Sequence, residues 1–335
     1  MTIGAEAAVA VGGVPVYEVL QICIYIDCVA CSPGHLILSS GRRVTLGIDL
    51  QSLRFIVRSR STVSFDRFLM LGRQFTHVSP ADVERELGPL NLLSAASLHT
   101  LAVNARKGVY SEPILAVLGA RQIDSMDFSS FEQATIVHDI NKPIADSLRE
   151  KFTCVYDGGT LEHVFDFPTA IRNAMEMVAV GGHYMGVSPA NNQSGHGFYQ
   201  FSPDLYWRVF SEDNGFEVEE ISICEARRSS PVYRIEDPML LGHRVMFTND
   251  YPAYVLVRAR RLRSVPIFQT PPQQPYYEAK WNPSDDAAPG NGRRSLRHWA
   301  KHSLPEPVKQ HLRNLLSYVM PPQVRTLHHS RFKKI

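Results

Sequence analysis

Short apolar runs alternate with segments of helical spacing through the middle of the chain. Ser79-Pro80 combines an N-cap residue with a proline at the first helical position, which predicts a helix start. The helix that follows has apolar residues at Val83, Leu87, Leu90 and Leu93. Runs of strand length lie at Phe68–Leu71, Arg121–Met126, Ala134–His138 and Phe152–Tyr156. This alternation indicates βαβ units and a parallel sheet.

The same alternation continues in the second half of the domain. Asp166 and Pro168 predict a helix start, and Gly181-Gly182 is expected to end that helix. Ser202-Pro203 predicts another helix start. Further strands are expected at Tyr184–Val187, Phe216–Cys224 and Tyr254–Ala259. We therefore expect an α/β domain with a doubly wound, mostly parallel sheet and helices on both faces.

The flanking segments have a different character. Residues 1–60 show no sustained period and are treated as an N-terminal extension of unassigned role, so the domain is expected at 61–262. Residues 263–292 are rich in proline and glycine, which is the composition of a linker. Residues 293–335 form a basic tail with helical spacing over Leu304–Val319. This tail is either a solvated face or a contact for an anionic membrane or another polyanion.

Charge and cysteine content narrow the classes of function. The 35 basic and 33 acidic residues give a formal charge of +2, so nucleic acid is not an expected partner. Cys28-Val-Ala-Cys31 has the spacing of half a zinc site or of a redox pair, but no second cysteine pair or histidine pair follows at ligand distance, and we expect neither a metal nor a redox function there. The apolar runs are shorter than the roughly 18 to 20 residues of a membrane span, and the start lacks a signal-peptide pattern. The expected location is cytoplasmic.

Three of the expected strands end in a carboxylate. Asp127, Asp139 and Asp157 each follow a short apolar run. In an open parallel sheet the ligand crevice lies beyond the carboxyl ends of the strands, where these acids would gather. Asp127 and Asp139 also have a plainer interpretation as helix N-caps, a role that aspartate favours.

The segment from Phe152 to Pro189 carries a resemblance to a known family. It contains a strand, the turn Asp157-Gly158-Gly159, the motif Leu-Glu-His-Val, a helix, a Gly-Gly turn and a strand that ends near Ser188-Pro189. With Asn214-Gly-Phe-Glu-Val218, this pattern resembles the class I S-adenosylmethionine-dependent methyltransferases over residues 68 to 260. The resemblance implies a seven-stranded, Rossmann-like sheet and S-adenosylmethionine as the cofactor.

The resemblance also assigns roles to the acids. It places Asp127 at the cofactor ribose, where a carboxylate can accept hydrogen bonds from both hydroxyl groups. It places Asp139 near the adenine amino group. Asp157 and Gly158 are implied to lie beside the methionine part of the cofactor.

The turn after the first strand departs from the family pattern. The expected Gly-x-Gly-x-Gly turn reads Met70-Leu-Gly-Arg-Gln-Phe75 here, so that Gly72 is its sole glycine. Arg73 and Gln74 can contact the cofactor carboxylate in its place, since a guanidinium can pair with it bidentately. The same side chains can instead fill the site of a domain that has lost activity.

The acceptor side offers two histidines. His163 and His196 are the candidate general bases, although His163 also suits a role in orienting its turn. The polar loop after the late strand contributes the candidate acceptor-binding residues Asn191, Asn192 and Tyr199. Turn formation is the plainer reason for Asn, Ser and Gly there.

Two functions remain open at this point. The first is a methyltransferase that acts on a small molecule or a saccharide. The second is a non-catalytic, methyltransferase-like binding or scaffold protein. A nicotinamide dehydrogenase is disfavoured because the Gly-x-Gly-x-x-Gly fingerprint is missing.

Overall fold

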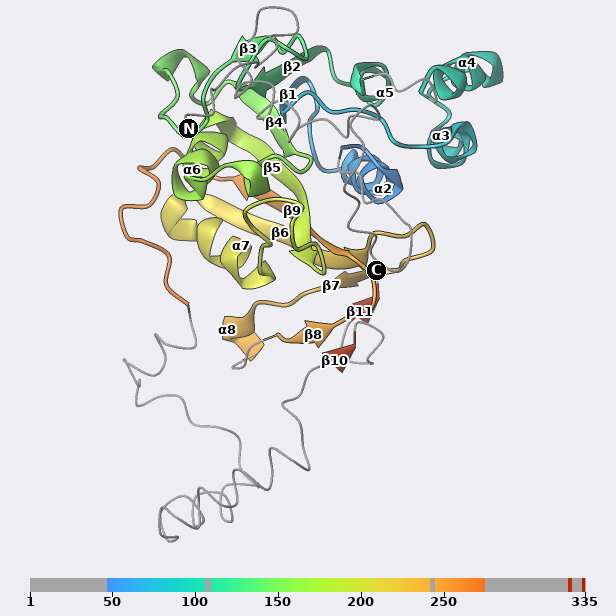
Figure 1. Cartoon of the computed structure of the whole chain (residues 1–335). Coiled ribbons are helices and arrows are strands. Elements are labelled where there is room, and N and C mark those ends of the chain that lie inside the picture. Colours follow the sequence, from blue (N-terminus) through green and yellow to red (C-terminus); the bar gives the residue numbers. More distant parts are fainter. Residues whose placement is uncertain (1–46, 106–109, 242–244, 275–324, 327–332, 335) are drawn as a thin grey trace, which may run out of the picture. The chain divides into compact units, whose positions relative to one another are not determined.

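The computed structural model describes residues 47–105, 110–241, 245–274, 325–326 and 333–334, all within the unit Val44–Ile335 (Figure 1). The predictions for Cys28 and Cys31, the helix over Leu304–Val319 and most of the basic tail lie outside these residues. Among the described residues, no helix is long and apolar enough to cross a membrane.

A single large sheet organises the domain. Its strand order is β11-β7-β6-β9-β5-β4-β1-β2-β3. The strands are β1 (Arg67–Leu71), β2 (Gln122–Asp127), β3 (Ile136–Val137), β4 (Phe152–Asp157), β5 (Val178–Asn191), β6 (Phe216–Glu225), β7 (Val232–Arg234), β9 (Ala253–Arg261) and β11 (Lys333–Lys334). A separate two-stranded sheet pairs β8 (Phe247–Thr248) with β10 (Arg325–Thr326).

The sheet has the Rossmann-like, mostly parallel architecture that was predicted. β1 pairs in parallel with β2 and β4, and the parallel pairing continues from β2 to β3 and from β4 to β5. β9 runs antiparallel between β5 and β6. The expected seven strands are β1 to β6 with β9, and the structure adds β7 and β11 beyond β6.

Helices cover both faces of the sheet, as the sequence predicted (Figure 1). The α-helices are α2 (Leu50–Ser59), α3 (Pro80–Leu87), α4 (Ala95–Ala105), α5 (Glu112–Val117), α6 (Phe167–Met177), α7 (Pro203–Val209) and α8 (Pro238–Leu241). In the described part of the chain, 3-10 helices lie at Gly88–Leu90, Asp146–Leu148, Leu161–His163 and Glu212–Asn214.

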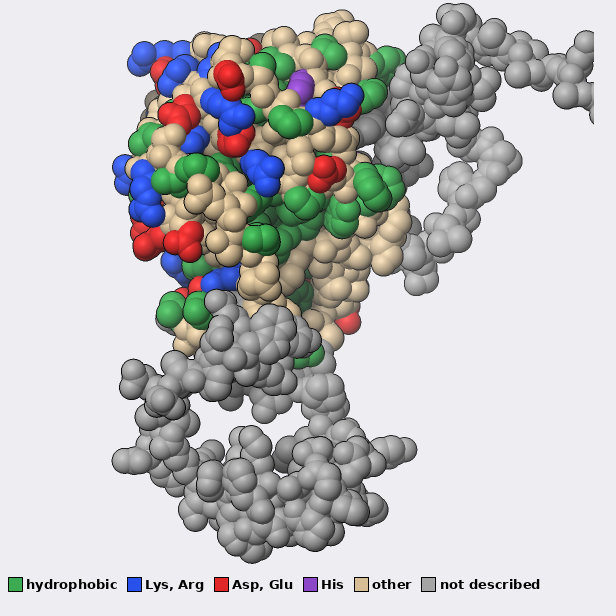
Figure 2. Space-filling view, turned by 90° about the vertical axis from the view of Figure 1, so that its left-hand side faces the viewer, with side chains coloured by type: hydrophobic (Ala, Val, Ile, Leu, Met, Phe, Trp, Pro, Cys, Tyr) green, Lys and Arg blue, Asp and Glu red, His purple; other side chains and the backbone are tan. Residues whose placement is uncertain are grey.

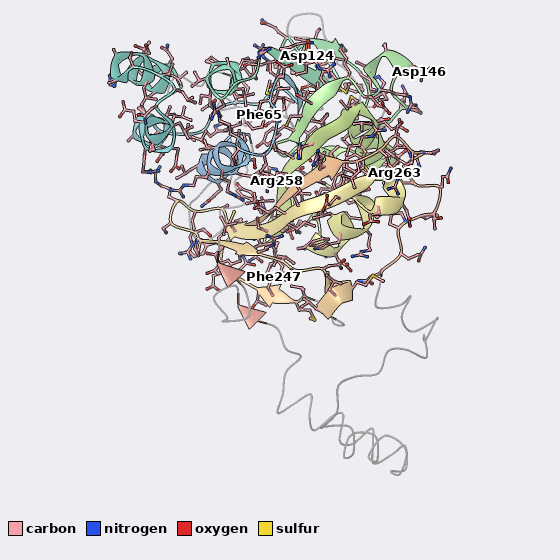
Figure 3. The ribbon with its side chains drawn as sticks, turned by 180° about the vertical axis from the view of Figure 1, so that it is seen from behind. Phe65, Asp124, Asp146, Phe247, Arg258 and Arg263 are labelled. Carbon is pink, nitrogen blue, oxygen red and sulfur yellow. The ribbon has the colours of Figure 1, made fainter. Side chains whose placement is uncertain are left out.

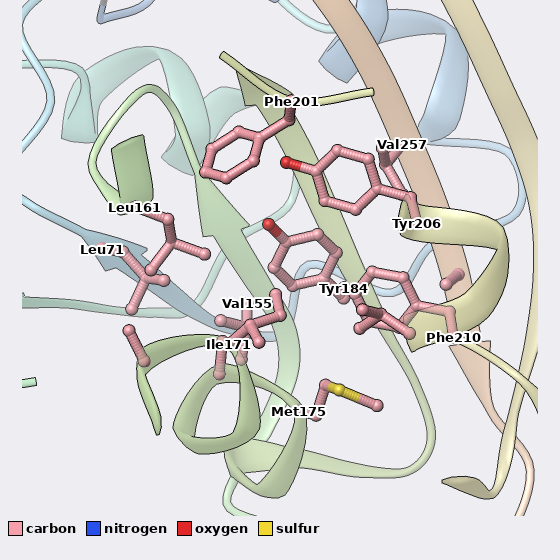
Figure 4. Packing of buried hydrophobic residues seen from close by; sticks show 14 of the residues in the cluster. Leu71, Val155, Leu161, Ile171, Met175, Tyr184, Phe201, Tyr206, Phe210 and Val257 are labelled. Atoms are coloured by element: carbon pink, nitrogen blue, oxygen red, sulfur yellow. The ribbon is translucent and has the colours of Figure 1, made fainter. Parts of the chain in front are cut away.

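Side chains that point to opposite faces of the buried strands belong to two separate hydrophobic cores. On β1, Phe68 and Met70 pack with α2, α3 and α5, whereas Leu69 and Leu71 pack with α6 and α7. Successive side chains of a strand point to opposite faces, so a strand buried on both sides reads as a continuous apolar run. One such face, built on Tyr184, is drawn in Figure 4.

The expected helix starts are confirmed. Ser79 caps α3 in a capping box with Asp82, and Asp166 caps α6 by accepting a hydrogen bond from Thr169 N. Ser202 caps α7 in the same way through Asp204 N. These caps satisfy backbone N–H groups that have no partner inside their own helix.

The Gly-Gly turn differs from the prediction. Helix α6 ends at Met177, and β5 begins at Val178, so the glycines lie inside the strand range. The pairing with β4 shifts between Val178 and His183, which places Gly181 and Gly182 in a bulge. Gly182 suits this place because an added Cβ would lie 2.8 Å from the carbonyl oxygen of Thr153.

Helix α2 shows that the folded domain starts before residue 61. Leu53, Phe55 and Ile56 on this helix are fully buried and belong to the core with Phe68. Arg258 of β9 joins the helix to the sheet, because it donates to Ser59 Oγ at 3.1 Å and to Glu219 of β6 at 2.8 Å. Figure 3 shows Arg258 beside this helix.

Candidate functional site

The candidate site lies where the strand order reverses. The chain runs from β1 outward to β3 and then returns to β4 on the other side of β1, which makes the β1/β4 boundary a topological switch point. The register pairs Leu71 with Met126 and with Asp157. Asp127 and Asp157, two of the three acids that the sequence predicted to gather, therefore lie at the same edge of the sheet as Gly72 and Gly158.

The turn after β1 packs tightly against the turn after β4. Gly72 has a φ of +67°, and an added Cβ there would lie 2.7 Å from Thr160 Oγ1. The Gln74 amide donates to Leu71 O at 2.7 Å, and its Oε1 would lie 2.5 Å from a Cβ on Gly158. The Gln74 side chain thus occupies the space between the two turns.

Arg73 is engaged by groups of the protein itself. Its Nε donates to Glu112 at 2.7 Å, and its Nη1 donates to the carbonyl oxygen of Glu132 at 2.8 Å. The guanidinium also lies 3.8 Å from the centre of the Tyr110 ring, at cation–π distance. A contact of Arg73 with a cofactor carboxylate would have to replace these interactions.

Two acidic side chains lie together beyond β2. The Asp127 carboxylate accepts backbone hydrogen bonds from Phe128, Ser129 and Arg73, while burial raises its pKa. Burial also raises the pKa of Glu132 to about 7, and the negative charge of Asp127 adds to this effect. Perturbed carboxyl groups gathered at a sheet edge are typical of functional sites.

Asp139 lies one strand farther from the switch point. Its carboxylate accepts from the backbone and the side chain of Asn141, and Lys142 lies 3.2 Å away. The Asn141 side chain, together with Lys142, lowers the pKa of Asp139. The residue closes its own turn in this structure, and no helix follows directly, so it is not a helix N-cap.

Asp157 is fully buried at the end of β4. It accepts hydrogen bonds from Thr160 N at 2.8 Å, Tyr184 Oη at 3.3 Å and Ser188 Oγ at 3.4 Å. Tyr206 extends this network by donating to Ser188 Oγ at 3.0 Å. Figure 4 shows the hydroxyl groups of both tyrosines pointing to the same side of the core. Burial, with the charge of Glu162, raises the pKa of Asp157.

The two candidate histidines converge on one carboxylate. Glu162 Oε1 lies 3.8 Å from His163 Nε2 and 3.6 Å from His196 Nε2. The His163 and His196 rings are 5.0 Å apart, measured between centroids. Burial lowers the pKa of His163, which favours the neutral imidazole that a base or a metal ligand requires.

The loop after β5 is tied to this cluster by its backbone. Phe198 N and Tyr199 N both donate to Glu162 O, at 2.8 and 3.2 Å. An added Cβ on Gly197 would lie 2.9 Å from the same oxygen. His196 is therefore held against Glu162 by the geometry of its loop.

The three expected acceptor-binding residues also hold the loop in place. The Asn191 and Asn192 amides donate to the Asn249 side chain at 2.7 Å and to its carbonyl oxygen at 2.6 Å. The Tyr199 hydroxyl donates to Phe165 O at 2.7 Å. These contacts account for loop formation, and an acceptor role for the three residues stays a prediction.

Sequence reasoning missed two site residues, Glu132 and Glu162. Glu162 stands inside the Leu-Glu-His motif, and a charged residue within an otherwise apolar segment is the signal that marks it. Glu132 lies in a polar loop with no distinguishing pattern, so its proximity to Asp127 emerges only in the structure.

Comparisons with known proteins find weak similarity to several solved structures. No protein-family model matches the sequence, and no curated protein does. One similar structure is the branched-chain polyamine synthase of Thermus thermophilus, with a TM-score of 0.34 and 12% identity over 65% of this chain. The alignment spans 57% of that synthase, little more than half of its length.

Two further similar structures are those of methyltransferases. The N-methyltransferase NodS of Bradyrhizobium japonicum has a TM-score of 0.32 and 15% identity, over 64% of this chain and 97% of NodS. The methyltransferase CalH, in complex with SAH, has a TM-score of 0.33 and 11% identity, over 62% of this chain and 54% of CalH.

Proposed function

We propose that this domain is an S-adenosylmethionine-dependent methyltransferase that acts on a small molecule, with a saccharide among the candidate acceptors. One observation carries the proposal: Asp127 and Glu132, two carboxyl groups with raised pKa values, lie beside the Gly72 turn at the switch point of the sheet. In open α/β sheets, ligands bind at this position.

The carboxyl groups of Asp127 and Glu132 are suited to bind the ribose hydroxyl groups of the cofactor. Carboxylate oxygens accept hydrogen bonds from neutral hydroxyl groups, and a carboxylate offers about four acceptor positions. Asp127 uses three of these positions for backbone N–H groups, so Glu132 is the better placed partner for a second ribose hydroxyl. Asp139 keeps its expected role near the adenine.

The methionyl group of the cofactor can reach the site only if the Gln74 side chain moves. Gln74 fills the space over Gly158 and has to leave it before the methionyl group can approach the turn. When bound, S-adenosylmethionine supplies a methyl group on a sulfonium, so the protein mainly aligns and encloses the reacting atoms. His196 and His163 lie together on the acceptor side and can hold or remove a proton there.

The same observation at Gln74 favours a second candidate function. A domain in which Gln74 stays bonded to Leu71 O has lost the space for the cofactor. Such a domain would act as a non-catalytic binding or scaffold protein.

Calorimetric titration of the full chain with S-adenosylmethionine and S-adenosylhomocysteine separates the two functions. We expect binding that weakens roughly tenfold or more in Asp127→Asn, since a charge-assisted hydrogen bond is worth about 1.5–3 kcal/mol. Asp124→Asn is the matched control, because Asp124 lies on the same strand and bonds to Gln122 and Thr135 (Figure 3).

Absence of binding at millimolar cofactor would overturn the methyltransferase proposal and favour the scaffold. If the cofactor binds, mass spectrometry of small molecules that copurify with the protein is the most direct route to the acceptor.

A further inference from the structure

The Glu162 side chain is buried without a hydrogen-bonding partner. Its exposed fraction is 0%, and neither carboxylate oxygen accepts a hydrogen bond from any described residue. An isolated carboxylate in a protein interior costs several kcal/mol. A bound cation is one group that would stabilise Glu162 where the fold holds it.

Two imidazole nitrogens lie near the Glu162 carboxylate, at distances too long for hydrogen bonds. The Oε1 to Nε2 distances are 3.8 Å for His163 and 3.6 Å for His196, and one ligand atom from each residue lies within 4.8 Å of the others. With metal–ligand bonds of about 2.1 Å, two ligands of a tetrahedral ion are roughly 3.4 Å apart. The observed spacing is close to that of ligands around a shared ion.

We propose that Glu162, His163 and His196 form a binding site for a divalent transition-metal ion of the zinc type. Two imidazole nitrogens and one carboxylate oxygen suit zinc better than magnesium, which prefers an all-oxygen shell. Three protein ligands leave at least one coordination position open, as in catalytic rather than structural zinc sites.

The surrounding structure is already arranged to hold the ligands. Glu162 and His163 lie on the 3-10 helix Leu161–His163, directly after β4, and His196 comes from the loop after β5. The two backbone hydrogen bonds to Glu162 O fix this loop at the cluster. Exposed side-chain fractions of 25% for His196 and 12% for His163 leave an approach for an ion from solvent.

The test is a titration of the full, chelator-treated chain with ZnCl2, followed by calorimetry. We expect one tight site in the wild type that weakens roughly hundredfold in His196→Ala and in Glu162→Gln, since even outer-shell partners contribute 10- to 100-fold to metal affinity. His99→Ala is the matched control: His99 lies 2.8 Å from Glu84 but is 69% exposed. MgCl2 should not bind at this site.

Equal zinc affinity in the wild type and in His196→Ala would overturn the assignment, as would tight magnesium binding that depends on His196. Because Glu162 is buried, circular dichroism is needed to check that Glu162→Gln still folds. If it does not fold, His196→Ala, in the partly exposed loop after β5, still tests the site.

Cobalt absorption spectra locate the metal independently. Co²⁺ at the proposed site should give visible bands without a thiolate charge-transfer band, and His196→Ala should remove them. A thiolate band would assign the metal to cysteines such as Cys28 and Cys31, and would contradict the proposal.

Discussion

The two sides of the switch-point edge differ in how their polar groups are satisfied. On the β1–β2 side, the side chains of Arg73, Gln74 and Asp127 all bond to neighbouring parts of the chain. On the side of the β4 and β5 loops, Glu162 and His196 lie together without a hydrogen bond between them. Unsatisfied buried polar groups call for an explanation, and a ligand is one. Under the proposed function, the first side is the cofactor side and is closed, and the second is the acceptor side and has groups free to bind a ligand.

One face of the domain carries charges of both signs. On the face drawn in Figure 2, Lys and Arg side chains are interspersed with Asp and Glu side chains.

The largest expected effect comes from Asp157, whose buried carboxylate accepts hydrogen bonds from the turn after β4 and from β5. Asp157→Ala should lower the free energy of unfolding by about 3 kcal/mol, because it leaves buried donors on Tyr184, Ser188 and Thr160 without an acceptor. Urea denaturation measures the change. Asp157→Asn, which retains one carbonyl acceptor, should cost less. A loss under about 1 kcal/mol in Asp157→Ala would show that the network is not important for stability.

Zinc bound at the proposed site should stabilise the native state against unfolding by mass action. At a free concentration 100 times its Kd, a ligand that binds only the native state adds about 2.7 kcal/mol. Thermal melts with and without ZnCl2 should show this gain in the wild type and in His99→Ala. The same gain in His196→Ala would place the ion elsewhere.

Gln74 tests whether the cofactor side is closed. Gln74→Ala removes the side chain that occupies the space over Gly158, so we expect S-adenosylmethionine to bind about tenfold more tightly, equivalent to about 1.4 kcal/mol. Gln122→Ala, at an exposed glutamine on β2, is the control. Weaker binding in Gln74→Ala would mean that the amide contacts the cofactor directly.

The smallest effect is a pH dependence from Glu132. Its pKa is raised from 4.5 to about 7, so the native state binds the proton more tightly than the unfolded state between these values. Stability from this group is therefore present at low pH and falls as pH rises through this window, by on the order of 1 kcal/mol after allowance for partial exposure. Glu132→Gln should reduce the pH slope of stability in urea denaturation, to which Asp157 with its raised pKa also contributes, whereas the exposed Glu217→Gln should leave the slope unchanged. Identical slopes in the wild type and Glu132→Gln would contradict the shift.

Local patterns predicted most of the fold. The strand from Phe152, the helix starts at Ser79, Asp166 and Ser202, and the burial of β1 on both faces all follow from periodicity and capping chemistry. The Gly181-Gly182 turn was misplaced because a glycine pair permits a bulge as readily as a helix end, and pairing with β4 decided between them.

Helix α2, before residue 61, is recognisable only in the folded domain. Leu50, Leu53 and Ile56 on α2 have helical spacing, but the helix is short and its apolar stripe is recognisable only against the sheet that it covers. Most helical stability in proteins comes from such tertiary packing rather than from local propensity.

The sequence by itself determined which residues form strands, which cap helices and which acids end strands, because these properties depend on neighbours along the chain. Only the tertiary structure decided that Glu132 joins Asp127 and that His196 joins Glu162. Those contacts depend on strand order and register, which bring loops from different βα units to one edge of the sheet.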